Sequence, residues 1–413
     1  MNHARPLPTP RLVGMGTLTF GLVAGFVVTA LPFLLAKAGV SVDRIATVSA
    51  AAMSPAFWAF LLTPLVDTGL TRRAYAFSLG LVAAASLAAA LWLFSPHRLV
   101  LFTALVLLAE LAAVLQGSAV GGWTTEFLPD TQRGKVGGWL NVANLGGGAL
   151  GSMFIMWLAG SVSFRALGVV LGLMVSASTL VLLRFPPPAT PVVRLRGILR
   201  ETSRSVVAAC RQPPVQLGFL LFLAPASCVA AINLFASLGQ DFHAGAQEVL
   251  WVTGAGASLA TGLGSLLGGY LADRMDRGVL YMSGGVLTGV CSVALALTSH
   301  TGISLAAGAL IYNALAGVCY AAFSALGFQL TGSRNPTAAT QLGLFAAAAN
   351  AAVVYMTWVD GQGYRLWHVR GLFLADGLAA LGAAIPLLWL LQRRVRKLRR
   401  AAGPHSPMLP VPG

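Results

Sequence analysis

Glu110 is the residue of this chain with the clearest capacity for chemistry, because it stands alone in a long apolar stretch. It lies near the middle of residues 99–120, within Leu107-Leu108-Ala109-Glu110-Leu111-Ala112. An ionisable side chain at mid-depth in a bilayer costs at least ~3 kcal/mol, so such a residue is a functional candidate by default. Desolvation favours the neutral carboxyl, which suits a group that takes up and releases a proton. The alternative is a permanently neutral Glu110 that donates a hydrogen bond to a backbone carbonyl.

Amides and tyrosines within apolar stretches form a second set of candidates. An amide surrounded by hydrocarbon needs a partner, which is either another helix or a ligand. The set consists of Asn144, Asn233, Tyr312, Asn313, Tyr320, Asn350 and Tyr355. Asn144 and Asn350 have a second interpretation, as a symmetric pair that joins helices.

Two acidic residues near the end of the chain have simpler interpretations. Asp376 lies near Arg370, which predicts a peripheral ion pair, and Asp360 begins Asp-Gly-Gln-Gly, which is typical of a turn. Asp241 and His243 could relay protons or bind a metal ion, but a solvated loop is the preferred interpretation. No HExxH pattern or Cys/His zinc spacing occurs, so we expect no metal and no cofactor.

The elements that carry these residues follow from composition. Of 413 residues, 57% are hydrophobic and only 27 are basic and 12 acidic, far fewer charges than a soluble protein of this length carries. The apolar runs have the length of membrane-spanning helices and not the alternating pattern of a β-barrel. We therefore predict an all-α polytopic membrane protein. The twelve expected spans are residues 12–36, 45–66, 74–95, 99–120, 138–160, 163–185, 215–238, 247–270, 279–299, 303–327, 338–359 and 369–392.

The basic residues predict the orientation of these spans. If both termini are cytoplasmic, 21 of the 27 Lys and Arg residues lie inside and six outside, as the positive-inside rule requires. The net charge of +15 then describes inner loops and a basic tail that contact anionic lipid. Nucleic acid is not an expected partner. The expected location is the inner (plasma) membrane.

The longest polar interruption divides the chain into four expected regions. These are an N-terminal six-helix bundle (1–185), a central basic cytoplasmic loop (186–214), a C-terminal six-helix bundle (215–392) and a basic cytoplasmic tail (393–413). Within the loop, residues 192–211 could form an amphipathic helix on the inner leaflet.

The two halves contain related sequences at an offset of 206 residues. This offset places Asp67 on Asp273, each just after an even-numbered span in an expected cytoplasmic loop. An Asp at a helix terminus, with arginines nearby, can form charge-assisted hydrogen bonds to a neighbouring helix end. We therefore predict a conformational latch. Its expected members are Asp67, Arg72, Arg73, Asp273, Arg274 and Arg277.

The second copy, Gly269-Tyr270-Leu271-Ala272-Asp273-Arg274-Met275-Asp276-Arg277, resembles the cytoplasmic Gly-x-x-x-Asp-Arg-x-x-Arg signature of the major facilitator superfamily. The first copy resembles a degenerate version, with Pro64 in the glycine position. The resemblance implies two six-helix bundles and secondary transport by alternating access. It also implies a cavity lined by spans one, four, seven and ten. That cavity would include Glu110, Asn233, Tyr312, Asn313 and Tyr320.

A finer resemblance concerns the peptide and acetyl-coenzyme A transporter branch that includes AmpG-type muropeptide permeases. Residues 25–73 and the segment from Glu126 to Gly148 are similar to this branch. The expected spans place no Lys or Arg at mid-depth, which weighs against phosphorylated or multiply carboxylated solutes. We expect a proton-coupled monomer that moves a small organic solute, with an exporter of amphipathic or drug-like compounds as the alternative. No enzymatic constellation is visible.

Overall fold

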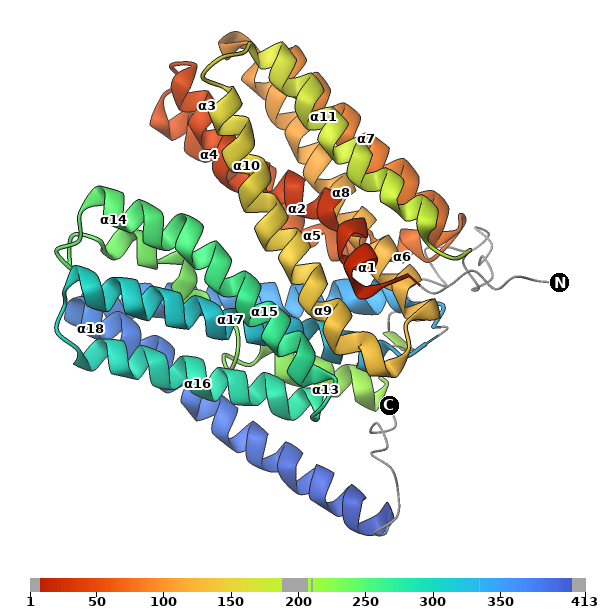
Figure 1. Ribbon diagram of the computed structural model, residues 1–413, viewed down its shortest axis with the longest axis vertical. Coiled ribbons are helices and arrows are strands. Elements are labelled where there is room, and N and C mark those ends of the chain that lie inside the picture. The colour runs from red at the N-terminus through yellow and green to blue at the C-terminus, as the bar shows by residue number, and fades with distance from the viewer. Residues whose placement is uncertain (1–7, 188–206, 209–210, 334, 403–413) are drawn as a thin grey trace. The chain divides into compact units, whose positions relative to one another are not determined.

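The computed structural model describes residues 8–187, 207–208, 211–333 and 335–402. Helices are the only regular elements in this part of the chain (Figure 1). The contacts group them into two compact units. Unit 1 comprises Met1–Leu128, Val142–Arg211 and Gly332–Ala347, and unit 2 comprises Pro129–Asn141, Gln212–Thr331 and Ala348–Gly413. Each unit therefore contains a segment from the opposite half of the sequence, whereas the expected boundary ran through residues 186–214.

Eight helical segments of the described chain are long and apolar enough to cross a membrane. These are Leu18–Lys37, Arg72–Trp92, Pro96–Phe127, Phe164–Arg184, Gln247–Ala272, Arg277–Leu297, Gly302–Thr331 and Ala338–Arg394. The last segment contains non-helical backbone at Trp367 and His368, where two helices meet in a sharp reversal. It thus corresponds to two of the expected spans.

Several other expected spans are broken into short helices, for which the sequence gives a reason. Residues 45–66 form α4 (Val42–Met53), α5 (Pro55–Trp58), η2 (Ala59–Leu61) and α6 (Thr63–Val66). Pro55 and Pro64 lack the N–H that would continue a helix, so a new segment begins near each one. Residues 138–160 are divided by a π-helical turn, η5 (Val142–Gly146), between α9 (Arg133–Asn141) and α10 (Gly147–Leu158).

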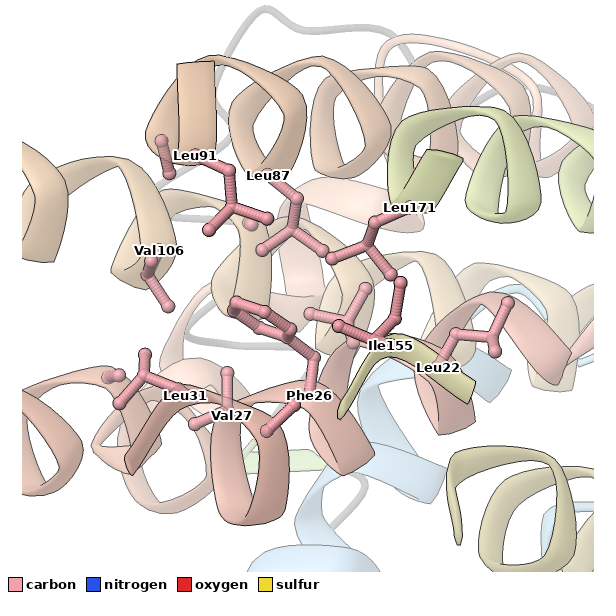
Figure 2. Packing of buried hydrophobic residues seen from close by; sticks show 14 of the residues in the cluster. Leu22, Phe26, Val27, Leu31, Leu87, Leu91, Val106, Ile155 and Leu171 are labelled. Atoms are coloured by element: carbon pink, nitrogen blue, oxygen red, sulfur yellow. The ribbon is translucent and has the colours of Figure 1, made fainter. Parts of the chain in front are cut away.

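Unit 1 is built around α8 (Leu99–Phe127), which packs against α7 (Arg72–Trp92), and α7 in turn packs against α11 (Phe164–Leu180) (Figure 1). The first span consists of α1 (Pro10–Gly16), α2 (Leu18–Gly25), η1 (Phe26–Ala30) and α3 (Leu31–Lys37). Side chains from these elements and α10 meet in one apolar core. Figure 2 shows Leu22, Phe26, Val27, Leu31, Leu87, Leu91, Val106, Ile155 and Leu171 pointing toward one another.

Unit 2 is built around α17 (Gly302–Thr331), which contacts α15 (Ala257–Ala272), α16 (Arg277–Leu297) and α9. Its remaining elements are α13 (Pro213–Leu223), η7 (Ala230–Asn233), η8 (Phe235–Leu238), α14 (Ala246–Leu250), η9 (Trp251–Gly256) and most of α18 (Ala338–Ala402). The expected amphipathic helix, most of the central loop and the end of the tail lie outside the described residues.

Glycines allow α15 and α9 to approach each other closely. A Cβ added to Gly269 would lie 2.5 Å from the carbonyl oxygen of Gly134 and 3.1 Å from Cα of Gly138. By contrast, a Cβ on Gly262 of the same helix would have no neighbour within 4 Å. Close helix packing therefore explains Gly269, but it does not explain Gly262.

This contrast gives a test of the packing. We expect Gly269→Ala to destabilise the protein by about 1–3 kcal/mol, because the helices must separate to admit the methyl group. Gly262→Ala should leave stability unchanged or raise it by at most about 1 kcal/mol, because alanine favours a helix. Thermal unfolding of both variants in the same detergent measures the difference. Equal stability of the two variants would contradict the packing described for α9 and α15.

Candidate functional site

Glu110 lies near the middle of α8, and its residue is only 4% exposed. Its neighbours Ala109, Ala112 and Ala113 belong to the apolar core of unit 1. Oε2 is buried and has no hydrogen-bond partner among the described residues, and no described charged group influences the carboxyl. In the alternative interpretation of Glu110, a neutral acid that donates to a backbone carbonyl, that hydrogen bond would have to come from Oε1.

An uncompensated carboxyl in such a place is neutral when it is shut off from water. Ionisation there would place a bare charge among alkyl groups, at a cost far above that of any single favourable contact. The residue can release its proton only when the protein around it admits water or a ligand cation. Glu110 therefore has the properties of a group whose protonation depends on access.

Asp67 lies at the centre of a charged cluster in unit 1, at the end of α6. Arg72 begins the next helix, α7, and donates from Nη2 to Asp67 Oδ1 at 2.8 Å. Arg72 Nη1 donates to Glu126 Oε1 at 2.9 Å. All three side chains are at most 5% exposed. The arginine thus forms ion pairs with two buried carboxylates at once.

The same cluster binds the beginning of α18, which comes from the second half of the sequence. The backbone N–H of Thr340 donates to Asp67 Oδ2 at 2.8 Å, and the Thr340 hydroxyl donates to the same oxygen at 2.7 Å. Arg72 also donates to the carbonyls of Asn335 and Pro336. Asp67 therefore caps the N-terminus of a helix, where a carboxylate is favoured by the unpaired N–H groups.

Asp273 makes the corresponding contacts in unit 2. Its carboxylate accepts hydrogen bonds from the backbone N–H of Gly134 at 2.6 Å and of Lys135 at 3.0 Å, at the N-terminus of α9. Arg277 begins α16 and donates to the carbonyl of Asp130 and to Gln329 Oε1. Here Gln329 is a neutral acceptor in the place that Glu126 has in unit 1.

The two clusters follow the offset of 206 residues at the aspartates and at the helix ends that they bind, whereas Arg72 and Arg277 are 205 residues apart. Adding 206 to Asp67 gives Asp273, and subtracting 206 from Thr340 and Pro336 gives Gly134 and Asp130. Each aspartate thus caps a helix of the other sequence half, and each arginine binds the carbonyl that precedes that helix. The repeat relates contacts and not only residue types, which is strong evidence for an internal duplication.

Burial raises the pKa of both aspartates, and their partners oppose this effect. For Asp67 the opposing groups are Arg72 and Thr340, and for Asp273 they are the N–H groups of Gly134 and Lys135, together with Arg277 and Lys135 as cations. The charged form of a buried carboxylate is stable only while these partners contact it. If the partners move away, the carboxylate must be hydrated by water or remain as an unfavourable buried charge.

Two of the expected latch residues do not join these clusters. The Arg73 guanidinium lies 6.0 Å from the ring centre of Phe77, and that of Arg274 lies 3.4 Å from the ring centre of Tyr270. Sequence reasoning missed Glu126, Thr340, Gln329 and the backbone at residues 134–135. The offset of 206 residues relates Thr340 to Gly134, so it links the backbone partners of the two aspartates only once one set is known.

The expected cavity residues have varied surroundings. Tyr312 and Asn313 are buried in unit 2, where the Tyr312 hydroxyl donates to Asp376 and Asn313 Oδ1 accepts from Thr261 at 3.1 Å. Asn233 donates to Thr357, and the Tyr355 hydroxyl donates to the Leu223 carbonyl at 2.7 Å. The partly exposed candidates are Asn144, Tyr320, Asn350 and Tyr355, and Asn233 is exposed.

The interpretations of Asp360 and Asp376 from the sequence were wrong. Asp376 is 3% exposed, and its partners are Ser292 and Tyr312 instead of Arg370, which is exposed. Asp360 is fully buried within α18 and does not form a turn, because the helix continues through Gly361 and Gly363 to the reversal at Trp367. No group of three or more metal-ligating side chains occurs in the described residues.

Comparison with known proteins agrees with this architecture. The family profile of the Major Facilitator Superfamily matches residues 13–235 and 217–411. The crystal structure of the human organic anion transporter MFSD10 (TETRAN) is 17% identical, with a TM-score of 0.69 over 93% of this chain and 100% of that one. The proton:xylose symporter XylE bound to 6-bromo-6-deoxy-D-glucose is 13% identical, with a TM-score of 0.67 over 92% and 94% of the two chains. No curated protein sequence matches.

The chain belongs to the major facilitator superfamily. It is a multi-pass membrane protein with the fold of that family, a secondary transporter of small solutes and not an enzyme.

Proposed function

We propose that this protein moves a small organic solute across the inner (plasma) membrane by alternating access, coupled to a proton at Glu110. The observation that carries the proposal is the buried carboxyl of Glu110, which has no charged neighbour and whose Oε2 has no hydrogen-bond partner in the described chain. A group in this position can exchange its proton only in a state that opens it to water. Proton release then depends on the conformation, which is the requirement for coupling.

The Asp67 and Asp273 clusters supply the conformational change in this proposal. Each joins one half of the sequence to a helix of the other half through buried, charge-assisted hydrogen bonds. We expect both clusters to be formed in one state of the cycle and hydrated in the other. Because the contacts of the two clusters correspond, we expect both clusters to form in the same state.

The solute is expected to be neutral where it meets the middle of the spans. No Lys or Arg is expected at mid-depth, whereas Asn and Tyr side chains could hold a sugar or a peptide. A muropeptide-like solute follows from the resemblance to the AmpG-type branch, but its carboxylates would have to lie away from the middle of the spans. Export of amphipathic or drug-like compounds is the second candidate, since the same side chains would serve a solute without a carboxylate.

The remaining parts of the proposal come from the charge pattern and the spans. We propose twelve spans in two six-helix bundles, with cytoplasmic termini, basic inner segments against anionic lipid, and a monomeric protein. Positive-inside asymmetry supports the orientation.

An uptake panel tests the solute class. Purified protein in proteoliposomes, with and without an inward pH gradient, is offered a labelled anhydro-muropeptide, xylose and the dye ethidium. A strain without its own muropeptide permease, carrying this chain, is tested in parallel. Gradient-dependent uptake of the muropeptide or the sugar supports the first candidate, and gradient-dependent expulsion of ethidium supports the second. If a solute is transported at the same rate with and without the pH gradient, the proposed proton coupling is wrong.

A further inference from the structure

A second buried carboxyl group without a hydrogen-bond partner occurs in unit 2, far along the chain from Glu110. Asp360 is 0% exposed, and neither Oδ1 nor Oδ2 has a hydrogen-bond partner among the described residues. An acid in this condition demands an explanation, because a buried polar atom without a partner costs about 1–3 kcal/mol and a charged one far more.

The reversal within α18 brings Asp360 close to Asp376. The two arms of the hairpin meet at Gly363 and Gly371, whose backbones are in direct contact, and Ala375 Cβ lies 2.9 Å from where a Cβ on Gly363 would be. Asp360 is one turn before Gly363, and Asp376 directly follows Ala375. The two carboxylates are near enough to repel each other when both are charged.

The neighbours of Asp376 favour its charged form. The hydroxyls of Ser292 on α16 and Tyr312 on α17 both donate to Oδ2, the latter at 3.0 Å, and the backbone N–H of Ala231 also contacts the carboxylate. A carboxylate that accepts several hydrogen bonds is stabilised as an anion even when it is buried. Asp376 therefore keeps its charge more readily than Asp360 does.

No positively charged group of the described chain acts on the pair. The titratable groups that act on the two aspartates from the surrounding elements are Tyr312 on α17, Cys291 on α16 and Cys228 before η7. None of these can carry a positive charge, and no described Lys, Arg or His influences either carboxylate. Two adjacent anions in such a place cannot both persist, so one of them must gain a proton or bind another cation.

We propose that Asp360 and Asp376 form a second proton-binding site, in which Asp360 carries the proton and Asp376 remains an anion. Asp360 takes one proton from water, forming an O–H bond on Oδ1 or Oδ2, and returns it when the hairpin of α18 admits water. The site exists whatever solute the chain carries. It is separate from the coupling at Glu110, which the proposed function assigns to one proton per solute.

Infrared difference spectroscopy of the full chain in lipid nanodiscs tests this proposal without a solute. The Glu110→Gln background removes the signal of that residue. In this background we expect a protonated-carboxyl C=O band near neutral pH that shifts when aspartate is labelled with ¹³C at its side-chain carboxyl. Asp360→Asn should abolish the band, and Asp241→Asn, at a more exposed site, should leave it intact. Asp376→Asn should keep the band. As the pH is raised, however, the band should disappear at a lower pH than in the Glu110→Gln background, because Asp360 loses its proton more easily without a neighbouring negative charge.

Two results would overturn the proposal. One is the absence of a ¹³C-aspartate-sensitive band, which the labelled protein reveals even if Asp360→Asn fails to fold. The other is a band that vanishes when choline chloride is replaced by NaCl at constant pH, which would assign the site to Na⁺. Neither result bears on Glu110, whose band is measured in the wild type and whose role is tested by transport.

Discussion

Replacement of Glu110 by Gln should abolish proton-driven accumulation of the solute while exchange of solute across the membrane continues. Gln has nearly the shape of a protonated Glu, so the variant resembles the loaded state but cannot release a proton. With one proton per solute, a pH gradient of one unit supports about tenfold accumulation, because it corresponds to about 1.4 kcal/mol. In Glu110→Gln we expect this ratio to fall to about one. Uptake and counterflow in proteoliposomes measure both quantities.

Glu248→Gln is the matched control, since Glu248 is exposed and undergoes the same chemical change. This variant should accumulate solute as the wild type does. If Glu110→Gln retains full accumulation while Glu248→Gln behaves as expected, Glu110 is a structural neutral acid and its coupling role is wrong.

Replacement of Arg72 by Ala should cause the largest loss of stability of any single change considered. Asp67 and Glu126 would remain buried without their shared cation, which typically costs about 3–5 kcal/mol. Burial already raises the pKa of Asp67, and loss of Arg72 removes the main opposing influence. A raised carboxyl pKa in the folded state means that stability falls as the pH rises through that pKa. The variant should therefore be less impaired at about pH 5 than at about pH 8.

Arg73→Ala provides the matched control, because Arg73 is the next residue but lies outside the cluster. It should change the free energy of unfolding by no more than about 0.5 kcal/mol. Unfolding in mixed micelles at both pH values gives the comparison. Adding Glu126→Gln to Arg72→Ala should restore part of the stability. An Arg72→Ala variant as stable as Arg73→Ala, at either pH, would show that the cluster contributes nothing to the folded state.

The apolar spans could be predicted from the sequence because hydrophobic length alone identifies a helix in a membrane. The breaks within them were harder to foresee. Pro55 and Pro64 mark two breaks plainly, whereas the π-helical turn Val142–Gly146 has no proline. The turn lies against α2, where a Cβ added to Gly21 would be 2.6 Å from the carbonyl oxygen of Asn144, and such a close approach is a property of the packed structure.

The candidate site was foreseen where a residue type was unusual by itself. Glu110 was the one clear acid in mid-span, and Asp67 and Asp273 were related by the repeat. The partners of the aspartates are largely backbone N–H groups, which every residue possesses and which no sequence pattern distinguishes.

The predictions for the two aspartates of α18 were wrong because residues that are near in sequence need not be near in space. Arg370 and Asp376 are six residues apart, a spacing that places them on different faces of a helix. The Asp-Gly-Gln-Gly sequence suggested a turn at Asp360, yet Gly363 serves the tight contact between the two arms of the hairpin.

The central claim is that solute movement and proton movement are one process through Glu110. Proteoliposomes with an entrapped pH-sensitive dye, a solute gradient and no initial pH gradient test this claim most directly, using whichever solute the uptake panel identifies. The wild type should change the internal pH as the solute moves, and Glu110→Gln should move solute without any pH change. Solute movement by the wild type with a constant internal pH would contradict the account.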